Sequence, residues 1–167
     1  MGKKLAVISL FTALLFIFSG CSTLVGLFSG KSDTMMEYLE STNDMDSAHL
    51  LLLMEEETIL SEEELLNFTE NKLLPGMRDF LNQAVDVREQ FDDEELLEVH
   101  DLLIASYEAL IEGNELWLAD HEDEAAYQLM DEYVTLYDQY TNELEALANE
   151  WGVTITWEEL DLEAESE

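Results

Sequence analysis

The residue best able to do covalent chemistry in this chain is its only cysteine, Cys21. It follows an apolar run over residues 5–18, which begins directly after two lysines at positions 3–4. A cationic start, a short apolar stretch and small residues at the cleavage point are the parts of a secretory signal peptide. The apolar run is too short to span a bilayer, which takes about 20 residues. The spacing therefore predicts that residues 1–20 are a signal peptide, cleaved between Gly20 and Cys21.

The segment Phe18-Ser19-Gly20-Cys21 resembles the lipobox of bacterial lipoproteins, with Phe18 at a position where that family usually has leucine. The resemblance implies that the Cys21 thiol receives a diacylglyceryl group and that cleavage makes Cys21 the new N-terminus. Two or more acyl chains, such as palmitate, hold a protein stably on a bilayer, whereas a single chain binds marginally. We therefore expect a lipid anchor at Cys21 on the extracytoplasmic face of the cell membrane.

The charge of the chain restricts its partners. It carries 40 acidic and 6 basic residues, a net charge of −34 at pH 7, which becomes about −36 when Lys3 and Lys4 leave with the signal peptide. So few cations cannot form a basic patch, which excludes nucleic acid as a partner. Direct adhesion to anionic lipids is excluded for the same reason, so the bilayer is a partner only through Cys21. A saline or alkaline setting, divalent cations or a basic protein partner would each suit this acidity.

Three histidines, at positions 49, 100 and 121, are the remaining candidates for catalysis or metal binding. Only Asp46-x-x-His49 approaches the acid-x-x-His spacing of di-metal helical bundles, so no di-metal centre is predicted. The chain has no EF-hand loop, nucleophile elbow, phosphate-binding glycine loop or zinc motif. His49 and His100 fall on apolar stripes and are expected to be hydrogen-bonded core residues. The sequence therefore predicts no enzyme and no cofactor, and leaves weak, diffuse binding of divalent cations as an alternative function.

Apolar residues at three-four spacing predict four helical segments, over about 33–60, 61–90, 92–117 and 124–151. The most regular seam is that of the last segment, and its three tyrosines are expected to be core residues: Ala126, Met130, Tyr133, Tyr137, Tyr140, Leu144, Leu147 and Trp151. Three local features qualify this pattern. Ser61 to Glu64 fit a capping box, the weak helix formers of 41–46 predict a fray or break, and Pro75-Gly76 predicts a kink or split.

Short connections between long helices favour antiparallel neighbours. We therefore expect an all-α fold, an antiparallel up-down four-helix bundle over residues 33–157. Gly152 fits a helix C-cap, and the β-branched segment after it, up to Trp157, is expected to be a short extended tail. The other regions are expected to be a flexible tether that carries the lipidated cysteine, over 21–32, and an acidic disordered tail, over 158–167.

Three of the four basic residues of the mature chain, Lys72, Arg78 and Arg88, fall on the second helical segment. One interpretation is that they neutralise crowded carboxylates on adjacent helices. The other is that they mark a less negative face where a partner docks. The sequence leaves both open.

A wider resemblance rests on three stretches: Phe18 to Cys21, Glu70 to Pro75, and the region from Val99-His100-Asp101-Leu102-Leu103 to Trp151-Gly152-Val153. In these the chain is similar to small, uncharacterised helical lipoproteins of Gram-positive bacteria, a family that supplies no catalytic residues. We therefore expect a membrane-anchored, non-enzymatic binding or interaction module at the cell surface, with a basic protein as a possible partner.

Overall fold

The computed structural model describes residues 29–156, and within them the chain is all-α, with no strand. The expected signal peptide, the lipidated Cys21, most of the expected tether and the tail from residue 157 onward lie outside the described residues. The helical elements are α1 (Ser29–Glu57), α2 (Glu62–Phe68), η1 (Thr69–Leu73), α3 (Leu74–Arg88), α4 (Glu94–Ala119) and α5 (Glu124–Glu150).

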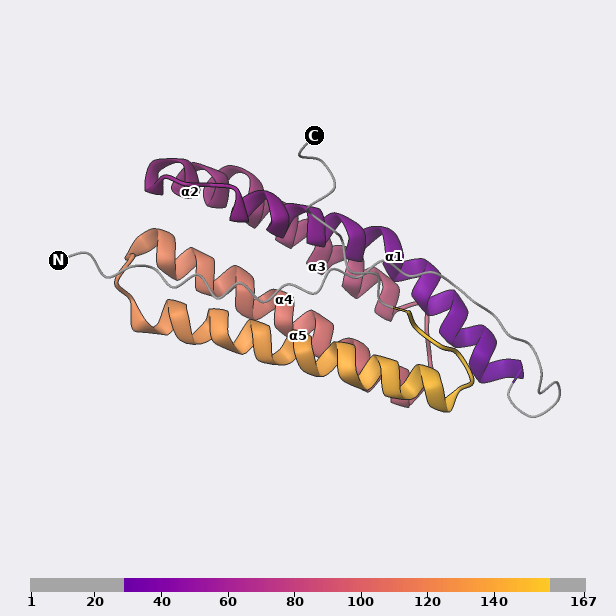
Figure 1. Cartoon of the computed structure of the whole chain (residues 1–167). Helices are drawn as coiled ribbons and strands as arrows, with labels where there is room; N and C mark the ends of the chain where they lie inside the picture. The colour runs from indigo at the N-terminus through magenta and orange to yellow at the C-terminus, as the bar shows by residue number, and fades with distance from the viewer. Residues whose placement is uncertain (1–28, 157–167) are drawn as a thin grey trace, which may run out of the picture.

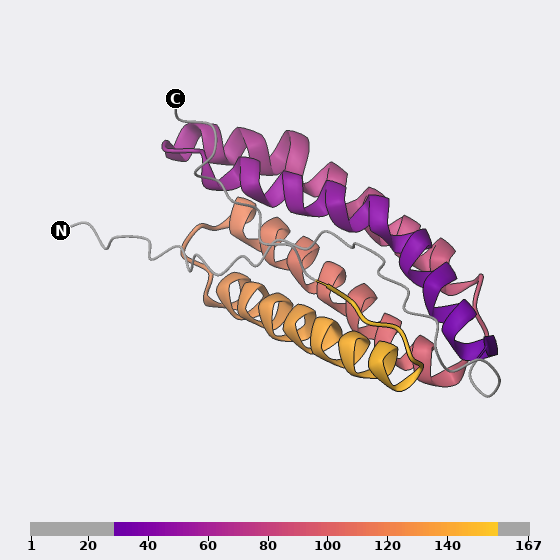
Figure 2. The ribbon, with the colours of Figure 1, turned by 45° about the vertical axis from the view of Figure 1, so that its right-hand side comes forward.

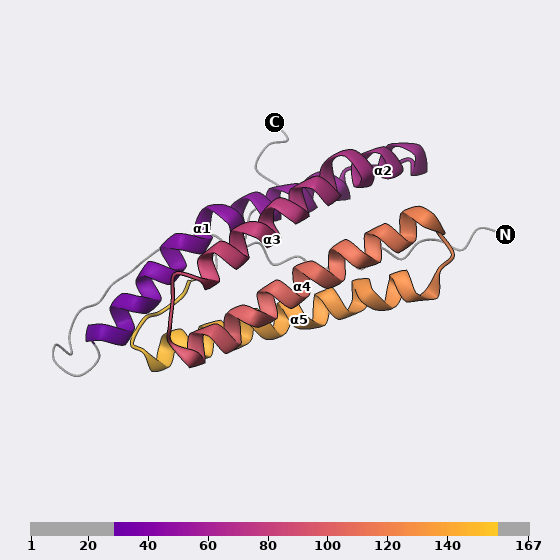
Figure 3. The same cartoon turned by 180° about the vertical axis from the view of Figure 1, so that it is seen from behind.

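The helices form two layers (Figure 1). One layer holds α1 beside α2 and α3, and the other holds α4 beside α5, as the views in Figures 2 and 3 also show. The most extensive interface joins α4 and α5, and α3 packs on α4 across the layers. The hydrophobic core lies between the layers and receives residues from all the long helices.

The stripes predicted from the sequence form this core. In α4 the residues at three-four spacing are all buried: Leu96, Val99, Leu103, Tyr107, Leu110, Asn114 and Trp117. In α5 the seam is buried at five positions and half-buried at the other three, which are Met130, Tyr137 and Leu147. After α5, Val153 and Ile155 are buried while Thr154 and Thr156 are exposed. This alternation lets the segment cover the core without helix or strand.

The helix ends follow the sequence signals. The Ser61 hydroxyl accepts from the Glu64 backbone N–H, which confirms Ser61 as the N-cap, and it donates to the Glu64 carboxylate, which in a full capping box would accept from the Ser61 backbone N–H. Asp93 caps α4 in a similar way, through the backbone N–H groups of Glu95 and Leu96. Gly152 has a φ of 82°, the left-handed conformation that favours glycine at a helix C-terminus. The predicted C-cap is therefore confirmed.

Two expectations about α1 are wrong. The helix begins at Ser29, so residues 29–32 of the expected tether are helical. It also runs unbroken through residues 41–46, because this stretch lies on the core, where Thr42 and Met45 are buried. Burial against neighbouring helices outweighs weak intrinsic propensity.

The disturbance expected at Pro75-Gly76 lies one turn earlier, in the π-helical turn η1. Pro75 has no N–H to donate to the carbonyl four residues before it. The wider turn accommodates this, because the Leu74 N–H bonds to the Thr69 carbonyl five residues back, and the backbone stays right-handed helical at both ends of η1. The chain therefore continues through α2, η1 and α3 without a split.

Gly113 sets the spacing of α4 and α5. A Cβ atom at this position would lie 3.1 Å from the Ala126 carbonyl oxygen, 3.2 Å from Leu129 Cβ and 3.3 Å from Met130 Cγ. A backbone carbonyl and a Cβ atom cannot move without the helix that carries them. Glycine at this position therefore permits the close approach of the two helices.

We expect Gly113→Ala to lower the free energy of unfolding by about 1 kcal/mol or more, because the overpacking cost exceeds the gain in helix propensity. The measurement is urea unfolding followed by circular dichroism. Gly30→Ala is the matched control, since nothing lies within 4 Å of its Cβ position and its stability should be equal or higher. A Gly113→Ala protein as stable as the parent would contradict the steric role.

Candidate functional site

A chain of hydrogen bonds crosses the interior of the bundle and links all four long helices. His100 Nε2 donates to the Ala84 carbonyl at 2.7 Å, since a carbonyl can only accept. In the neutral ring Nδ1 is then an acceptor, so the Tyr38 hydroxyl donates to it at 2.8 Å. Tyr140 in turn donates to the Tyr38 oxygen at 3.2 Å. The chain runs from α5 through α1 and α4 to α3.

The second buried histidine, His49, joins α1 to α4 and α5. Its Nδ1 lies 3.4 Å from the Tyr107 hydroxyl and its Nε2 lies 3.2 Å from the Tyr133 hydroxyl. A neutral ring has one donor and one acceptor, so one hydroxyl accepts and the other donates. The rings of Phe80, Tyr107 and Tyr137 pack edge-on around the imidazole, with centroids 5.0 to 5.8 Å away.

Burial keeps this interior uncharged. It lowers the pKa of His49 to about 3 and also lowers that of His100, so both rings are neutral at pH 7. Burial raises the pKa of the hydroxyls of Tyr38, Tyr107, Tyr133, Tyr137 and Tyr140. Each histidine uses both ring nitrogens in contacts with neighbouring groups. They are hydrogen-bonded core residues, as the sequence predicts, and neither is presented to a substrate.

Asp46 is the exception in this interior. It is buried in α1, and its Oδ1 atom has no hydrogen-bond partner in the described structure. Burial raises the pKa of Asp46 to about 7, although its contact with the Thr42 hydroxyl acts in the opposite direction. The Asp46 carboxylate adds to the rise in tyrosine pKa at Tyr38, Tyr107 and Tyr137. A buried carboxylate without a cation therefore lies among the tyrosines.

Each of the four cations in residues 29–156 forms an ion pair at the surface with a carboxylate of another helix or of that helix's cap residue. Lys72 pairs with Glu55 of α1, Arg78 Nη2 with Glu115 Oε1 of α4 at 2.5 Å, and Arg88 with both carboxylate oxygens of Asp101 of α4. All these side chains are about half exposed. This geometry supports neutralisation of crowded acids. A docking role for these three residues stays a prediction.

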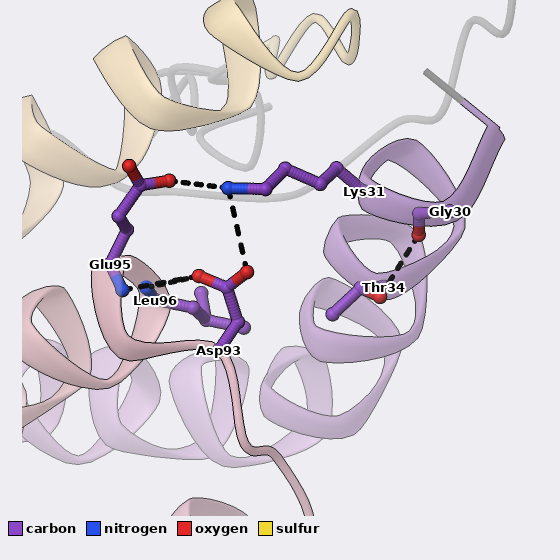
Figure 4. A network of polar contacts seen from close by, with 6 residues as sticks. All are labelled: Gly30, Lys31, Thr34, Asp93, Glu95 and Leu96. Atoms are coloured by element: carbon purple, nitrogen blue, oxygen red, sulfur yellow. Dashed lines mark hydrogen bonds and ion pairs between the residues drawn. The ribbon is translucent and has the colours of Figure 1, made fainter. Parts of the chain in front are cut away.

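Lys31 fastens the beginning of α1 to the rest of the bundle (Figure 4). Its Nζ atom bonds to Glu95 and lies 3.5 Å from Asp93, the residue that caps α4. It also lies 4.5 Å from the centroid of the Trp151 ring, at the end of α5. These contacts explain why α1 begins before the predicted start, since they fix its first turn against two other helices.

An open groove of about 520 Å³ lies at the other end of the bundle. Its walls come from α2, η1, the last turn of α4 and the connection to α5, and its lining residues are Glu63, Leu66, Asn67, Glu70, Leu118 and His121. No local pattern in the sequence signals this groove, because its two walls are about 50 residues apart in the sequence.

Neither metal coordination nor a membrane span is seen in residues 29–156. No three His, Cys, Asp or Glu side chains there are grouped to hold a metal ion. No helix of this part is both long and apolar enough to cross a bilayer. Comparisons of the chain with protein-family models, curated proteins and solved structures found no match.

Replacement of Asp46 tests the buried carboxylate. The folded protein holds the Asp46 proton to a higher pH than the unfolded chain does. Its contribution to stability is therefore fully present below the ordinary pKa of 3.8 and is lost as the pH rises to about 7. We expect Asp46→Asn to remove this loss, so that its stability relative to the parent rises between pH 5 and pH 8 by roughly 2–4 kcal/mol.

Urea unfolding of both proteins at about pH 5 and pH 8 measures this difference. The control is Asp44→Asn, which alters an exposed carboxylate two residues away on the same helix. Asp44→Asn should follow the parent at both pH values. An Asp46→Asn protein that is less stable than the parent at pH 8 would show that the ionised carboxylate has a stabilising partner.

Joint replacement of Arg78 and Arg88 by glutamine tests the ion pairs. We expect a lower melting temperature in dilute buffer, because two cations leave a strongly acidic surface, and a smaller difference in about 0.5 M salt, where exposed charges are screened. Differential scanning calorimetry at both salt concentrations gives the result. An unchanged melting temperature in dilute buffer would instead favour the docking role of these residues.

Proposed function

We propose that this protein is a non-enzymatic binding module, anchored by lipid at Cys21 to the extracytoplasmic face of the cell membrane, which presents an acidic surface to a basic protein partner. The observation that carries the proposal is the charge of the described chain. Residues 29–156 hold 34 carboxylates and four basic side chains. All four cations are engaged in ion pairs, so none is available to attract an acidic partner. Such a surface attracts cationic segments over distances of about the Debye length and repels other acids.

The bundle is suited to act as a spacer as well as a binding surface. We propose the antiparallel up-down topology for it, which the short connections at alternate ends support (Figures 1 and 3). In this arrangement α1 begins at Ser29, eight residues after Cys21 in the sequence. At 29 residues it is about 40 Å long, so we propose that the groove at the other end faces away from the bilayer.

The interior supports a binding role rather than chemistry. Two of the three histidines that the sequence offers as acid–base groups, His49 and His100, are buried and neutral, whereas the third, His121, is half-buried at the groove. Asp46 is buried too and is not among the groove-lining residues. Weak binding of divalent cations stays a prediction, and no grouping of side chains within residues 29–156 favours a specific site for them.

Replacement of Cys21 by alanine tests the anchor. Without the thiol no diacylglyceryl group can be attached, so we expect the protein to be released from the membrane fraction or to accumulate uncleaved. Cell fractionation and intact mass of the purified protein measure this. Ser22→Ala is the control and should stay with the membranes. A Cys21→Ala protein that fractionates and migrates like the parent would show that the anchor is wrong.

The same strains report on the partner. Crosslinking in cells should enrich a basic protein with the parent and with Ser22→Ala, and lose it with Cys21→Ala, because the anchor places the module at the membrane surface. Enrichment of acidic proteins alone would contradict the proposed charge recognition.

A further inference from the structure

The groove between α2 and the end of α4 differs from the rest of the acidic surface because its walls are held in place on both sides. On the α4 side, His121 Nδ1 donates to the Trp117 carbonyl at 2.6 Å, and the two rings pack with centroids 4.7 Å apart. The Tyr127 hydroxyl donates to the His121 carbonyl at 2.8 Å, which ties the connection to α5. These contacts therefore hold His121 and the connection to α5 in place in the free protein.

The opposite wall is held just as firmly. The Ser61 hydroxyl, bonded to the backbone N–H and the carboxylate of Glu64, fixes the first turn of α2. Asn71 Nδ2 donates to both the side chain and the backbone carbonyl of Asn67, at 2.8 and 3.1 Å. Lys72, in the next turn, pairs with Glu55 and lies over the Phe68 ring. A preformed groove requires little ordering on binding, which favours affinity.

The lining combines an apolar floor with two carboxylates. Leu66 and Leu118 are half-buried, whereas Glu63 and Glu70 are exposed. The nearest cations on the adjoining elements, Lys72 and Arg78, are paired with Glu55 and Glu115. Further acids are close in the sequence to the lining residues: Glu62, Glu64, Asp120, Glu122, Asp123 and Glu124. No lysine or arginine lines the groove, and its one histidine, His121, donates its Nδ1–H to the Trp117 carbonyl.

A lysine or arginine side chain is complementary to this lining, because it has an aliphatic stem for the leucines and a charged head for the carboxylates. Its aliphatic stem can lie on the leucines while its charged head reaches a carboxylate. Arginine can also bind a carboxylate through two parallel hydrogen bonds. A volume of about 520 Å³ is in the range of peptide and ligand pockets and exceeds what one ion needs. A phosphate-bearing or acidic ligand would meet repulsion at every charged position.

We propose that this groove is the docking site of the basic partner, and that it takes a short segment rich in arginine or lysine. The inference rests on the function proposed above and specifies where on the acidic surface the partner binds. The groove faces the end of the bundle opposite to Lys31, so its occupant would approach from the side away from the lipid anchor.

The test is binding of an acetylated and amidated hexa-arginine peptide to the purified chain at physiological salt, by isothermal titration calorimetry. Glu63→Gln/Glu70→Gln removes the two groove carboxylates. Glu143→Gln/Glu150→Gln is the matched control, because these residues are also seven positions apart, exposed and on one helix, yet lie outside the groove. All four glutamates are exposed, so both variants should fold. We expect the groove variant to bind at least about 10-fold more weakly and the control to change less than about 2-fold, a difference of about 1 kcal/mol or more.

Mapping by backbone amide chemical shifts gives an independent check. With the peptide bound, the largest changes should occur at Leu66, Glu70, Leu118 and His121. Equal weakening in both variants, with shifts spread over the surface, would overturn the groove but leave the acidic binding module standing. Failure of the parent to bind the peptide at all would overturn the proposed function, and the groove with it.

Discussion

The arrangement of the helices depends on one set of buried polar contacts, those of His49 and His100. Each ring nitrogen of these residues meets a group from another helix, and the four long helices all contribute. An apolar core tolerates sliding and rotation of its helices, because one methyl group replaces another at little cost. A hydrogen bond between buried groups does not tolerate such movement. If the partner is lost, a desolvated donor or acceptor remains, which costs about 1–3 kcal/mol. The histidines therefore fix the register of the two layers.

The same interior contains groups whose ionisation destabilises the folded state. Asp46 lies among the tyrosines with one oxygen unpartnered, and ionisation there opposes folding. The histidines have the opposite dependence on pH, because burial lowers their pKa and protonation opposes folding. As the pH falls, protonation of Asp46 stabilises the folded protein, whereas protonation of His49 and His100 destabilises it. The interior is therefore least charged below the pKa of Asp46, about 7, and above the lowered pKa values of the two histidines, in mildly acidic solution.

The surface follows a different principle. With four cations among 34 carboxylates in residues 29–156, repulsion favours separation of the helices. The cations lie where they reduce it most, since Lys31, Lys72, Arg78 and Arg88 each join two elements. At the far end, the groove-lining residues include no cation, and Glu63 and Glu70 stay exposed beside an apolar floor. The interior fixes the shape, and the distribution of the few cations decides which acidic region is left for a partner.

Local signals in the sequence determined the helices and their ends: three-four spacing gave the buried stripes, Ser61 the cap of α2 and Gly152 the end of α5. These depend on neighbours within one turn, which the sequence displays. Continuity of α1 through residues 41–46 was decided by the tertiary structure, because burial of Thr42 and Met45 outweighs propensity. The tertiary structure also decided that the Asp46 Oδ1 atom has no hydrogen-bond partner, and it formed the groove at Leu66 and Leu118. Whether a buried group finds a hydrogen-bond partner, and whether the surface is concave, both depend on how helices far apart in the sequence pack together. No local sequence pattern encodes that packing.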